Sequence, residues 1–274
     1  MSLLTPTEIK RLCAEYSLTP SKKYGQNYLI SELPVQKMIE AAQIKPGDAV
    51  YEIGPGFGIL TFELLKAGAI VRAFEIEQKL KSYWEAHMVE YPGLEIVWGN
   101  VLRQWNEYIQ NELRPYKVIA NLPYQITSEV LETILESTNQ PTQVICMVQK
   151  EVAERIVARP GDMSILAVSI QYFGVPKIVA KVSRGSFWPS PKVDSAVLSI
   201  TNIQSRGESV DFFRLVKAGF HHRRKKLLNN IVEAYNISKI EVEDIFEKLN
   251  LNKNIRAEEL SIEEWEKFSK LLTR

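Results

Sequence analysis

The chain has 274 residues, 45% of them hydrophobic and 24% charged, and its formal net charge of +1 is ordinary for a soluble globular protein. No apolar run approaches about 18 residues, which excludes a transmembrane helix, and two cysteines are too few for a disulfide framework. The first residues lack the basic and apolar regions of a signal peptide, so a cytoplasmic location is expected. The spacing of His87, His221 and His222 does not suit metal ligation, so no metal site is expected.

The first 29 residues contain a predicted helix and a predicted loop. Thr5-Pro6-Thr7-Glu8 combines a capping box with a proline at the first helical position, which predicts a helix that ends near Tyr16. Residues 19–29 then carry basic, amide and aromatic side chains in a segment expected to be a loop. Taken alone, this segment is also consistent with a solvated linker.

A glycine-rich turn follows the first predicted strand. Residues 49–53 form a short apolar strand, and residues 54–58 read Gly-Pro-Gly-Phe-Gly. This order opens a nucleotide-binding β-α-β unit, whose glycines let backbone N–H groups approach a ligand closely. The spacing is GxGxG and not the GxGxxG of dinucleotide sites. Glu52 before the turn and Glu75 after the next strand (70–74) favour a nucleoside ligand, with Glu75 placed to accept both ribose hydroxyls.

Strands and helices alternate through most of the chain. Further strands are predicted at 94–98, 116–120 and 142–148, and helices at 59–66, 126–136 and 150–159. This alternation predicts a mostly parallel sheet with helices on both faces. Strands at 164–173 and 177–182, followed by one at 195–200, are expected to add a terminal antiparallel hairpin. The predicted fold is therefore a Rossmann-like α/β sheet of the variant that S-adenosylmethionine-dependent methyltransferases use.

The tetrapeptide Asn121-Leu122-Pro123-Tyr124 follows the buried strand predicted at 116–120. Its proline ends the strand, so an Asn amide and a Tyr ring are set down where open α/β sheets bind ligands. Such a pair suits methylation of an exocyclic amine such as adenine N6. The Asn121 oxygen and a neighbouring backbone carbonyl can hold the two N–H bonds, and the Tyr124 ring can stack on the base. A strand followed by a proline turn is the alternative, and these four residues alone do not decide between the two.

The C-terminal part of the chain is predicted to be helical. Helical patterns run at about 209–220, 223–235, 239–249 and 261–272. A polar segment precedes them, which predicts an α/β domain of residues 1–205 and a small all-α domain of residues 206–274. Residues 217–226 hold five Lys or Arg residues together with His221 and His222, which makes this run a candidate phosphate-binding surface. A solvated helix face is the alternative.

Seven short motifs stand out along the chain. They are Gly25-Gln26-Asn27-Tyr28-Leu29, Glu52-Ile53-Gly54-Pro55-Gly56, Glu75, Gly99-Asn100, Asn121-Leu122-Pro123-Tyr124, the stretch 186–195, and Phe220-His221-His222-Arg223-Arg224-Lys225. In this order they resemble the ribosomal RNA adenine dimethylase family over about residues 17–270. Leu122 after Asn121, and Gly25 before Gln26, favour the small-subunit type over the large-subunit, antibiotic-resistance methylases.

The resemblance implies a methyl donor and a set of site residues. The donor is S-adenosylmethionine, and the implied cofactor-binding residues are Asn27, Leu29, Gly54, Glu75, Asn100 and Asn121. The implied catalytic residues are Asn121, Leu122, Tyr124 and Phe187, with the rings of Tyr124 and Phe187 on either side of an adenine flipped out of the RNA. The candidate RNA contacts are Arg223, Arg224, Lys225 and Lys226.

The resemblance also implies a substrate. This is 16S rRNA in the assembling small (30S) ribosomal subunit, where two adjacent adenosines in the loop of the 3′-terminal hairpin are each methylated twice at N6. The protein is expected to be monomeric and to need neither a metal nor a membrane. Three positions depart from the family pattern: Tyr28 replaces Phe, Asn100 replaces Asp, and residues 163–167 replace Tyr-Gly-Arg-Leu-Ser. Asn100 bears on cofactor contacts, and the missing Arg removes any contact made there.

Other protein classes fit the sequence less well. An NAD-dependent dehydrogenase needs GxGxxG and a catalytic His or Tyr/Lys set. A DNA adenine methylase shares the logic of the Asn121 tetrapeptide but not the basic C-terminal helices. A large-subunit rRNA adenine dimethylase and a non-catalytic assembly or transcription factor on the same fold stay open as alternatives. The intact Glu75, Asn121 and Tyr124 argue against the non-catalytic alternative.

Overall fold

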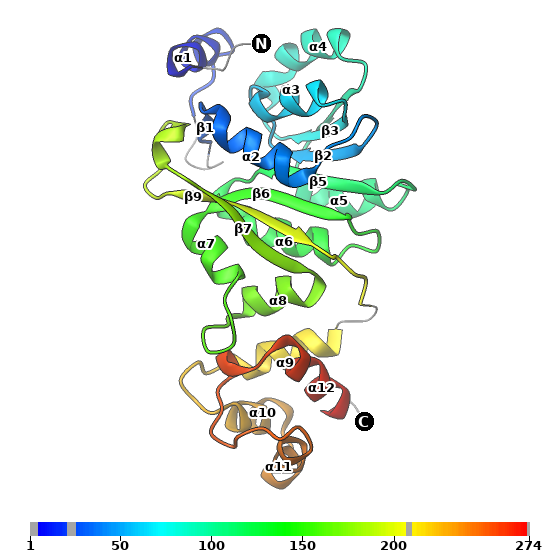
Figure 1. Ribbon diagram of the computed structural model, residues 1–274, viewed down its shortest axis with the longest axis vertical. Coiled ribbons are helices and arrows are strands. Elements are labelled where there is room, and N and C mark those ends of the chain that lie inside the picture. The colour runs from blue at the N-terminus through cyan, green and yellow to red at the C-terminus, as the bar shows by residue number, and fades with distance from the viewer. Residues whose placement is uncertain (1–4, 21–25, 207–209, 273–274) are drawn as a thin grey trace. The chain divides into compact units, whose positions relative to one another are not determined.

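The computed structural model describes residues 5–20, 26–206 and 210–272 (Figure 1). The predicted loop residues 21–25, among them Gly25, and residues 207–208 of the polar segment lie outside the described residues. The chain divides into a first unit of Met1–Ala153 and Val175–Ile203 and a second unit of Glu154–Gly174 and Gln204–Arg274. The domain boundary after residue 205 stays a prediction.

A seven-stranded sheet forms the first unit, in the order β4-β3-β2-β5-β6-β9-β7. Its strands are β2 (Ala49–Ile53), β3 (Ile70–Glu75), β4 (Leu94–Trp98), β5 (Tyr116–Asn121), β6 (Gln143–Gln149), β7 (Val175–Val182) and β9 (Ser195–Thr201). Strands β2 to β6 pair in parallel, and β9 runs antiparallel to both β6 and β7. The predicted fold class, a mostly parallel Rossmann-like sheet with a terminal antiparallel hairpin, is confirmed.

Helices cover both faces of this sheet (Figure 1). They are α2 (Glu32–Ala42), α3 (Ile59–Lys66), α4 (Lys81–Glu90), α5 (Val101–Ile109) and α6 (Thr127–Leu135). All five residues of β2 are buried, as expected for a central strand covered on both faces. The edge strand β7 instead has exposed lysines at Lys177 and Lys181, which discourage pairing with another chain.

Local sequence signals place the first helix and a small ribbon. Helix α1 (Pro6–Glu15) begins after Thr5, whose hydroxyl accepts a hydrogen bond from the Glu8 N–H at 3.2 Å, as the capping box predicts. Two short strands, β1 (Tyr28–Leu29) and β8 (Phe187–Trp188), pair antiparallel in a separate two-stranded sheet. No helix among the described residues is long and apolar enough to cross a membrane.

One predicted strand is wrong. Residues 164–173 form helix α8 (Ile165–Phe173), which begins at Ser164, whose hydroxyl accepts a hydrogen bond from the Ala167 N–H at 3.2 Å. Most of the helix is apolar and buried around its whole circumference, so the sequence shows no helical period and resembles a buried strand. The terminal antiparallel hairpin is therefore made by β7 and β9.

Four C-terminal helices pack in the second unit together with α8. They are α9 (Val210–Gly219), α10 (Leu227–Tyr235), α11 (Lys239–Lys248) and α12 (Ile262–Leu272). All four were predicted, but α10 begins at Leu227, and the residues just before it form a turn. The core includes the fully buried Trp265, Phe246 and Phe268. Helix α7 (Lys150–Ile156) spans the point where the chain first passes from the first unit to the second.

Candidate active site

A pocket in the first unit gathers most of the predicted site residues. It lies at the carboxyl ends of β2, β3 and β5, where an open α/β sheet binds its ligand. Among its lining residues are Asn27, Leu29, Gly54, Glu75, Asn121, Leu122, Tyr124 and Phe187. These residues come from five separate segments of the chain, which the fold brings to one place.

The glycine-rich turn forms one wall of this pocket. Gly54 and Gly56 have φ angles of +70° and +57°, which an L side chain rarely adopts. Apart from Gly54 itself and its two chain neighbours, no heavy atom of the described residues lies within 4 Å of where a Cβ on Gly54 would stand, so this stretch of backbone is open to a ligand. A Cβ on Gly56 would instead meet the Tyr28 ring at 3.3 Å. The first glycine therefore leaves room for a ligand, and the second allows an aromatic ring to pack.

Glu75 ends β3 and is held by the turn. Its Oε2 accepts a hydrogen bond from the Gly56 N–H at 3.2 Å, and its Oε1 accepts one from the Glu77 N–H at 2.7 Å. Burial raises the pKa of Glu75 to about 7, although these N–H groups favour the ionised form. Each carboxylate oxygen keeps acceptor capacity beyond these bonds. Glu75 can therefore accept hydrogen bonds from the hydroxyl groups of a ligand in the pocket.

Glu52 is a second buried carboxyl group in the same wall. Thr61 in α3 donates a hydrogen bond to its Oε2 at 2.6 Å. Complete burial raises the pKa of Glu52 to about 8, and the charge of Glu75 adds to the increase. Glu52 is therefore mostly protonated at neutral pH. Its observed contact is structural, because it joins the end of β2 to the helix that follows the turn.

The β1–β8 ribbon brings two distant segments into the pocket. Leu29 pairs with Phe187, and the Ile30 N–H donates to the Ser186 carbonyl at 2.8 Å. This pairing sets Asn27 and Phe187 in the same lining. Residues 19–29 were predicted to be a loop, because a two-residue strand carries no periodic signal.

The tetrapeptide at the end of β5 is fixed by three sets of contacts. Asn121 pairs with Met147 in β6, and the Leu122 N–H donates to the Met147 carbonyl at 3.1 Å. The Pro123 carbonyl accepts from the Ile126 N–H at 3.2 Å and from the Thr127 hydroxyl at 3.1 Å. The Tyr124 hydroxyl lies 2.6 Å from the Ser195 hydroxyl, and burial raises the pKa of Tyr124, which keeps the phenol protonated.

Tyr28 also lines the pocket, although it is not one of the predicted site residues. Its ring packs against Phe57 at a centroid distance of 5.0 Å, and the residue is 8% exposed. Its buried hydroxyl has no hydrogen-bond partner among the described residues. A buried hydroxyl costs free energy unless it is bonded, so Tyr28 brings an unsatisfied polar group into the wall of the pocket.

Asn100 is the predicted cofactor residue that does not line this pocket. It stands between β4 and α5, and its Oδ1 accepts a hydrogen bond from the Leu102 N–H at 3.0 Å. This is the geometry of a helix N-cap. The observed role of Asn100 is therefore to begin α5, and a contact with a cofactor stays a prediction.

The four predicted RNA contacts lie in the second unit, in the turn between α9 and α10, and all are exposed. Arg223 lies 3.5 Å from Glu258, and Lys225 lies 3.1 Å from Glu233. The ammonium group of Lys226 donates to the Asn254 side chain at 2.5 Å. Exposed ion pairs of this kind are worth little, so these cations can exchange partners readily.

The sheet topology and the position of the pocket define a Rossmann-like methyltransferase. A family profile described as "Ribosomal RNA adenine dimethylase" matches residues 18–274. The chain belongs to this family. It is therefore an rRNA adenine dimethyltransferase, and its methyl donor is S-adenosylmethionine.

Relatives and solved structures agree with this assignment. A protein of Dehalococcoides mccartyi named "Ribosomal RNA small subunit methyltransferase A" is 42% identical over 95% of this chain and 91% of its own length. A protein of the same name from Moorella thermoacetica is 36% identical over 99% of both chains. The crystal structure of a dimethyladenosine transferase from Plasmodium falciparum is similar with a TM-score of 0.74 and 25% identity, covering 88% of this chain and 95% of that one.

The pocket fits S-adenosylmethionine by its chemistry. The open backbone at Gly54 allows close approach, and the Glu75 carboxylate is an acceptor suited to ribose hydroxyls. When bound, the cofactor supplies an electrophilic methyl group on a sulfonium.

Proposed function

We propose that this protein methylates 16S rRNA in the small ribosomal subunit, placing two methyl groups on N6 of each of two adjacent adenosines in the loop of the 3′-terminal hairpin. The observation that carries the proposal is the placement of Asn121 and Tyr124 in the same pocket as Gly54 and Glu75. Residues suited to hold the target base and residues suited to bind a nucleoside thus lie together at one edge of the sheet. The two curated relatives carry names that refer to the small subunit, which supports this choice over large-subunit RNA.

The cofactor is proposed to lie along the first wall of the pocket. Glu75 accepts the ribose hydroxyls, and the backbone of Gly54 approaches the ligand closely. Asn27 and Leu29, carried by the β1 segment, complete the binding site. Asn100 is proposed to accept a hydrogen bond from the adenine amino group through Oδ1, whose second lone pair is available beside its helix-capping bond.

The target adenine is proposed to enter between two aromatic rings. Tyr124 and Phe187 stack on the faces of a base flipped out of the RNA. Hydrogen bonds within the turn already occupy the Pro123 carbonyl, which makes the Asn121 amide oxygen and the Leu122 carbonyl the candidate acceptors for N6. These acceptors favour a pyramidal nitrogen whose lone pair points at the methyl group.

These acceptors form their strongest hydrogen bonds as N6 becomes cationic in the transition state. Interactions that strengthen there lower the barrier and raise the rate. No general base is needed, because the proton can leave N6 after methyl transfer. Arg223, Arg224, Lys225 and Lys226 are proposed to contact RNA phosphates. The protein is proposed to act as a monomer.

One assay tests the proposal. The protein is incubated with tritiated S-adenosylmethionine and, in separate reactions, with small subunits that lack the modification or with large subunits that lack adenine methylation. The labelled nucleoside is identified after digestion. The proposal predicts N6,N6-dimethyladenosine in the 3′-terminal hairpin of 16S rRNA. Label in large-subunit RNA would favour the large-subunit alternative, and cofactor binding without transfer to either subunit would favour a non-catalytic assembly factor.

A further inference from the structure

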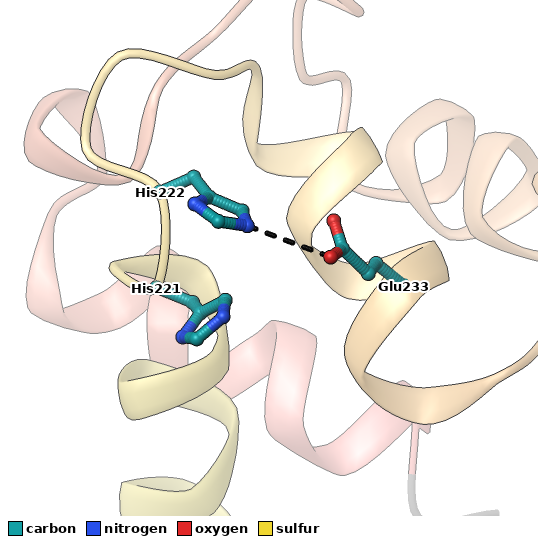
Figure 2. Close-up of side chains that lie close together, drawn as sticks. All are labelled: His221, His222 and Glu233. Carbon is teal, nitrogen blue, oxygen red and sulfur yellow. Dashed lines mark ion pairs between the residues drawn. The ribbon is translucent and has the colours of Figure 1, made fainter.

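Three side chains of the second unit converge beside the turn between α9 and α10 (Figure 2). His221 and His222 lie in the turn, and Glu233 lies on α10. One potential ligand atom from each residue lies within 4.8 Å of those of the other two. The spacing of the histidines alone did not predict a metal site, because the third potential ligand, Glu233, comes from the next helix.

We propose that His221, His222 and Glu233 bind a divalent transition metal ion, with Zn²⁺ as the best fit. Two imidazoles and one carboxylate form a ligand set that Zn²⁺ uses, with a water completing a tetrahedron. Mg²⁺ and Ca²⁺ prefer oxygen ligands and suit this set poorly.

The distance between His222 and Glu233 is close to the one that a tetrahedral ion requires. Bonds of roughly 2.0–2.1 Å to zinc put neighbouring ligand atoms roughly 3.3 Å apart. The Nε2 of His222 and the Oε1 of Glu233 are already 3.5 Å apart. Figure 2 shows the His222 ring pointing at the carboxylate, with the His221 ring on the same side of the turn. His221 is exposed, and its nearest ring nitrogen lies within 4.8 Å of the other two ligand atoms.

The backbone around the site is held in place by a buried side chain. Asn230 of α10 donates hydrogen bonds to the Gly219 carbonyl at 2.6 Å and to the His222 carbonyl at 3.2 Å. These bonds tie the turn that carries the histidines to the helix that carries Glu233. A ligand set on such a support loses little conformational freedom when the ion binds.

Glu233 is prepared to act as a ligand. Lys225 contacts its Oε2 at 3.1 Å, whereas His222 faces its Oε1. The two carboxylate oxygens thus have different partners. Lys225 can keep its contact with Oε2 while Oε1 binds the ion. The alternative is a surface ion pair between Glu233 and these two residues, with no metal.

The experiment is a calorimetric titration of ZnCl₂ into the full-length protein, with any affinity tag removed and bound metal stripped by chelation. We expect one saturable site. His221→Ala, His222→Ala and Glu233→Gln should each weaken binding at least tenfold. The matched control is His87→Ala, since His87 is the third histidine of the sequence and lies in the first unit, on α4. This control should bind zinc as the parent does.

A second readout needs no variant. Co²⁺ added to the parent protein should give the intense visible absorption of a four-coordinate ion, and Zn²⁺ should displace it. A parent protein with no saturable zinc site, or with only six-coordinate Co²⁺, would overturn the proposal. Parental zinc affinity in any of the three ligand variants would also overturn it. So would an equal loss of zinc affinity in the His87 variant. The test uses neither cofactor nor RNA, so its result is independent of the proposed function.

Discussion

The hydroxyl oxygens of Tyr124 and Ser195 lie 2.6 Å apart, although the two residues come from the turn after β5 and from the start of β9. Ser195 is fully buried, so its hydroxyl is a fixed point within the sheet. Tyr124 lines the pocket, and this bond restricts the orientation of its ring. The antiparallel strand β9 thereby helps to position the ring that is proposed to stack on adenine.

The first prediction concerns this bond. Ser195→Ala removes a partner worth about 0.5–1.5 kcal/mol, so methyl transfer should slow about two- to tenfold, while S-adenosylmethionine affinity stays the same. Rates on pre-bound subunits and calorimetry measure the two quantities. Ser199→Ala, another buried serine of β9, is the matched control and should transfer at the parental rate. Equal losses in the two variants would mean that β9 packing, and not the Tyr124 bond, controls the rate.

The second prediction concerns the charge of Glu75. Its pKa of about 7 means that the carboxylate is mostly neutral at pH 6 and mostly ionised at pH 8. The ionised form is the better acceptor for ribose hydroxyls, so cofactor affinity should rise with pH across this window, by up to about tenfold. Glu75→Gln should bind about 10- to 100-fold more weakly at pH 8 and lose this rise.

Calorimetry at pH 6, 7 and 8 on both proteins makes the comparison. Titration of the cofactor itself contributes equally to the parent and to the Glu75→Gln variant, so the difference between them reports on Glu75. A parent and a variant with parallel pH profiles would remove Glu75 from the binding site.

How far the sequence predicts this structure depends on the signal that each element carries. The parallel strands are short apolar runs bounded by turn residues, and the C-terminal helices have a clear helical period. The glycine turn and the Asn121 tetrapeptide mark strand ends. These features predicted the sheet, and the structure brings most of the predicted site residues to one pocket. Helix α8 is apolar on all sides, so its period is invisible.

Long-range contacts account for what the sequence did not predict. The β1–β8 pairing joins Leu29 to Phe187 and depends on tertiary structure alone. The Tyr124–Ser195 bond and the approach of Glu233 to His222 likewise join residues whose neighbourhood only the fold creates. Local patterns contain no information about such contacts.

The third prediction concerns Asn100. Asn100→Asp keeps the cap of α5, because Asp caps helices as well as Asn does, and adds charge to the proposed contact with the adenine amino group. Its cofactor affinity should rise, up to about tenfold. Asn100→Ala should weaken binding by a similar factor and also lose about 1 kcal/mol of unfolding free energy with the cap. If the Asp variant binds no more tightly than the parent at equal stability, Asn100 serves only to begin α5.

The fourth prediction concerns RNA. Arg223→Glu and Arg224→Glu should weaken binding to small subunits and lower the slope of log affinity against log salt by about one unit per lost phosphate contact. Cofactor affinity should not change, because the pocket lies in the first unit. Lys248→Glu, an exposed lysine at the end of α11, is the control for charge alone. If the arginine variants keep the parental salt slope, the turn does not contact phosphates and is a solvated surface.

The most direct test of the proposed chemistry is the single-turnover rate of methyl transfer by Asn121→Ala on pre-bound small subunits, with Phe187→Ala beside it. Asn121 is proposed to act on N6 as it becomes cationic, so its loss should slow the chemical step by about 100-fold or more with little change in subunit affinity. Loss of the Phe187 stack should instead weaken capture of the flipped base, by roughly 1–3 kcal/mol. An Asn121→Ala variant that transfers methyl groups at the parental rate would contradict the account.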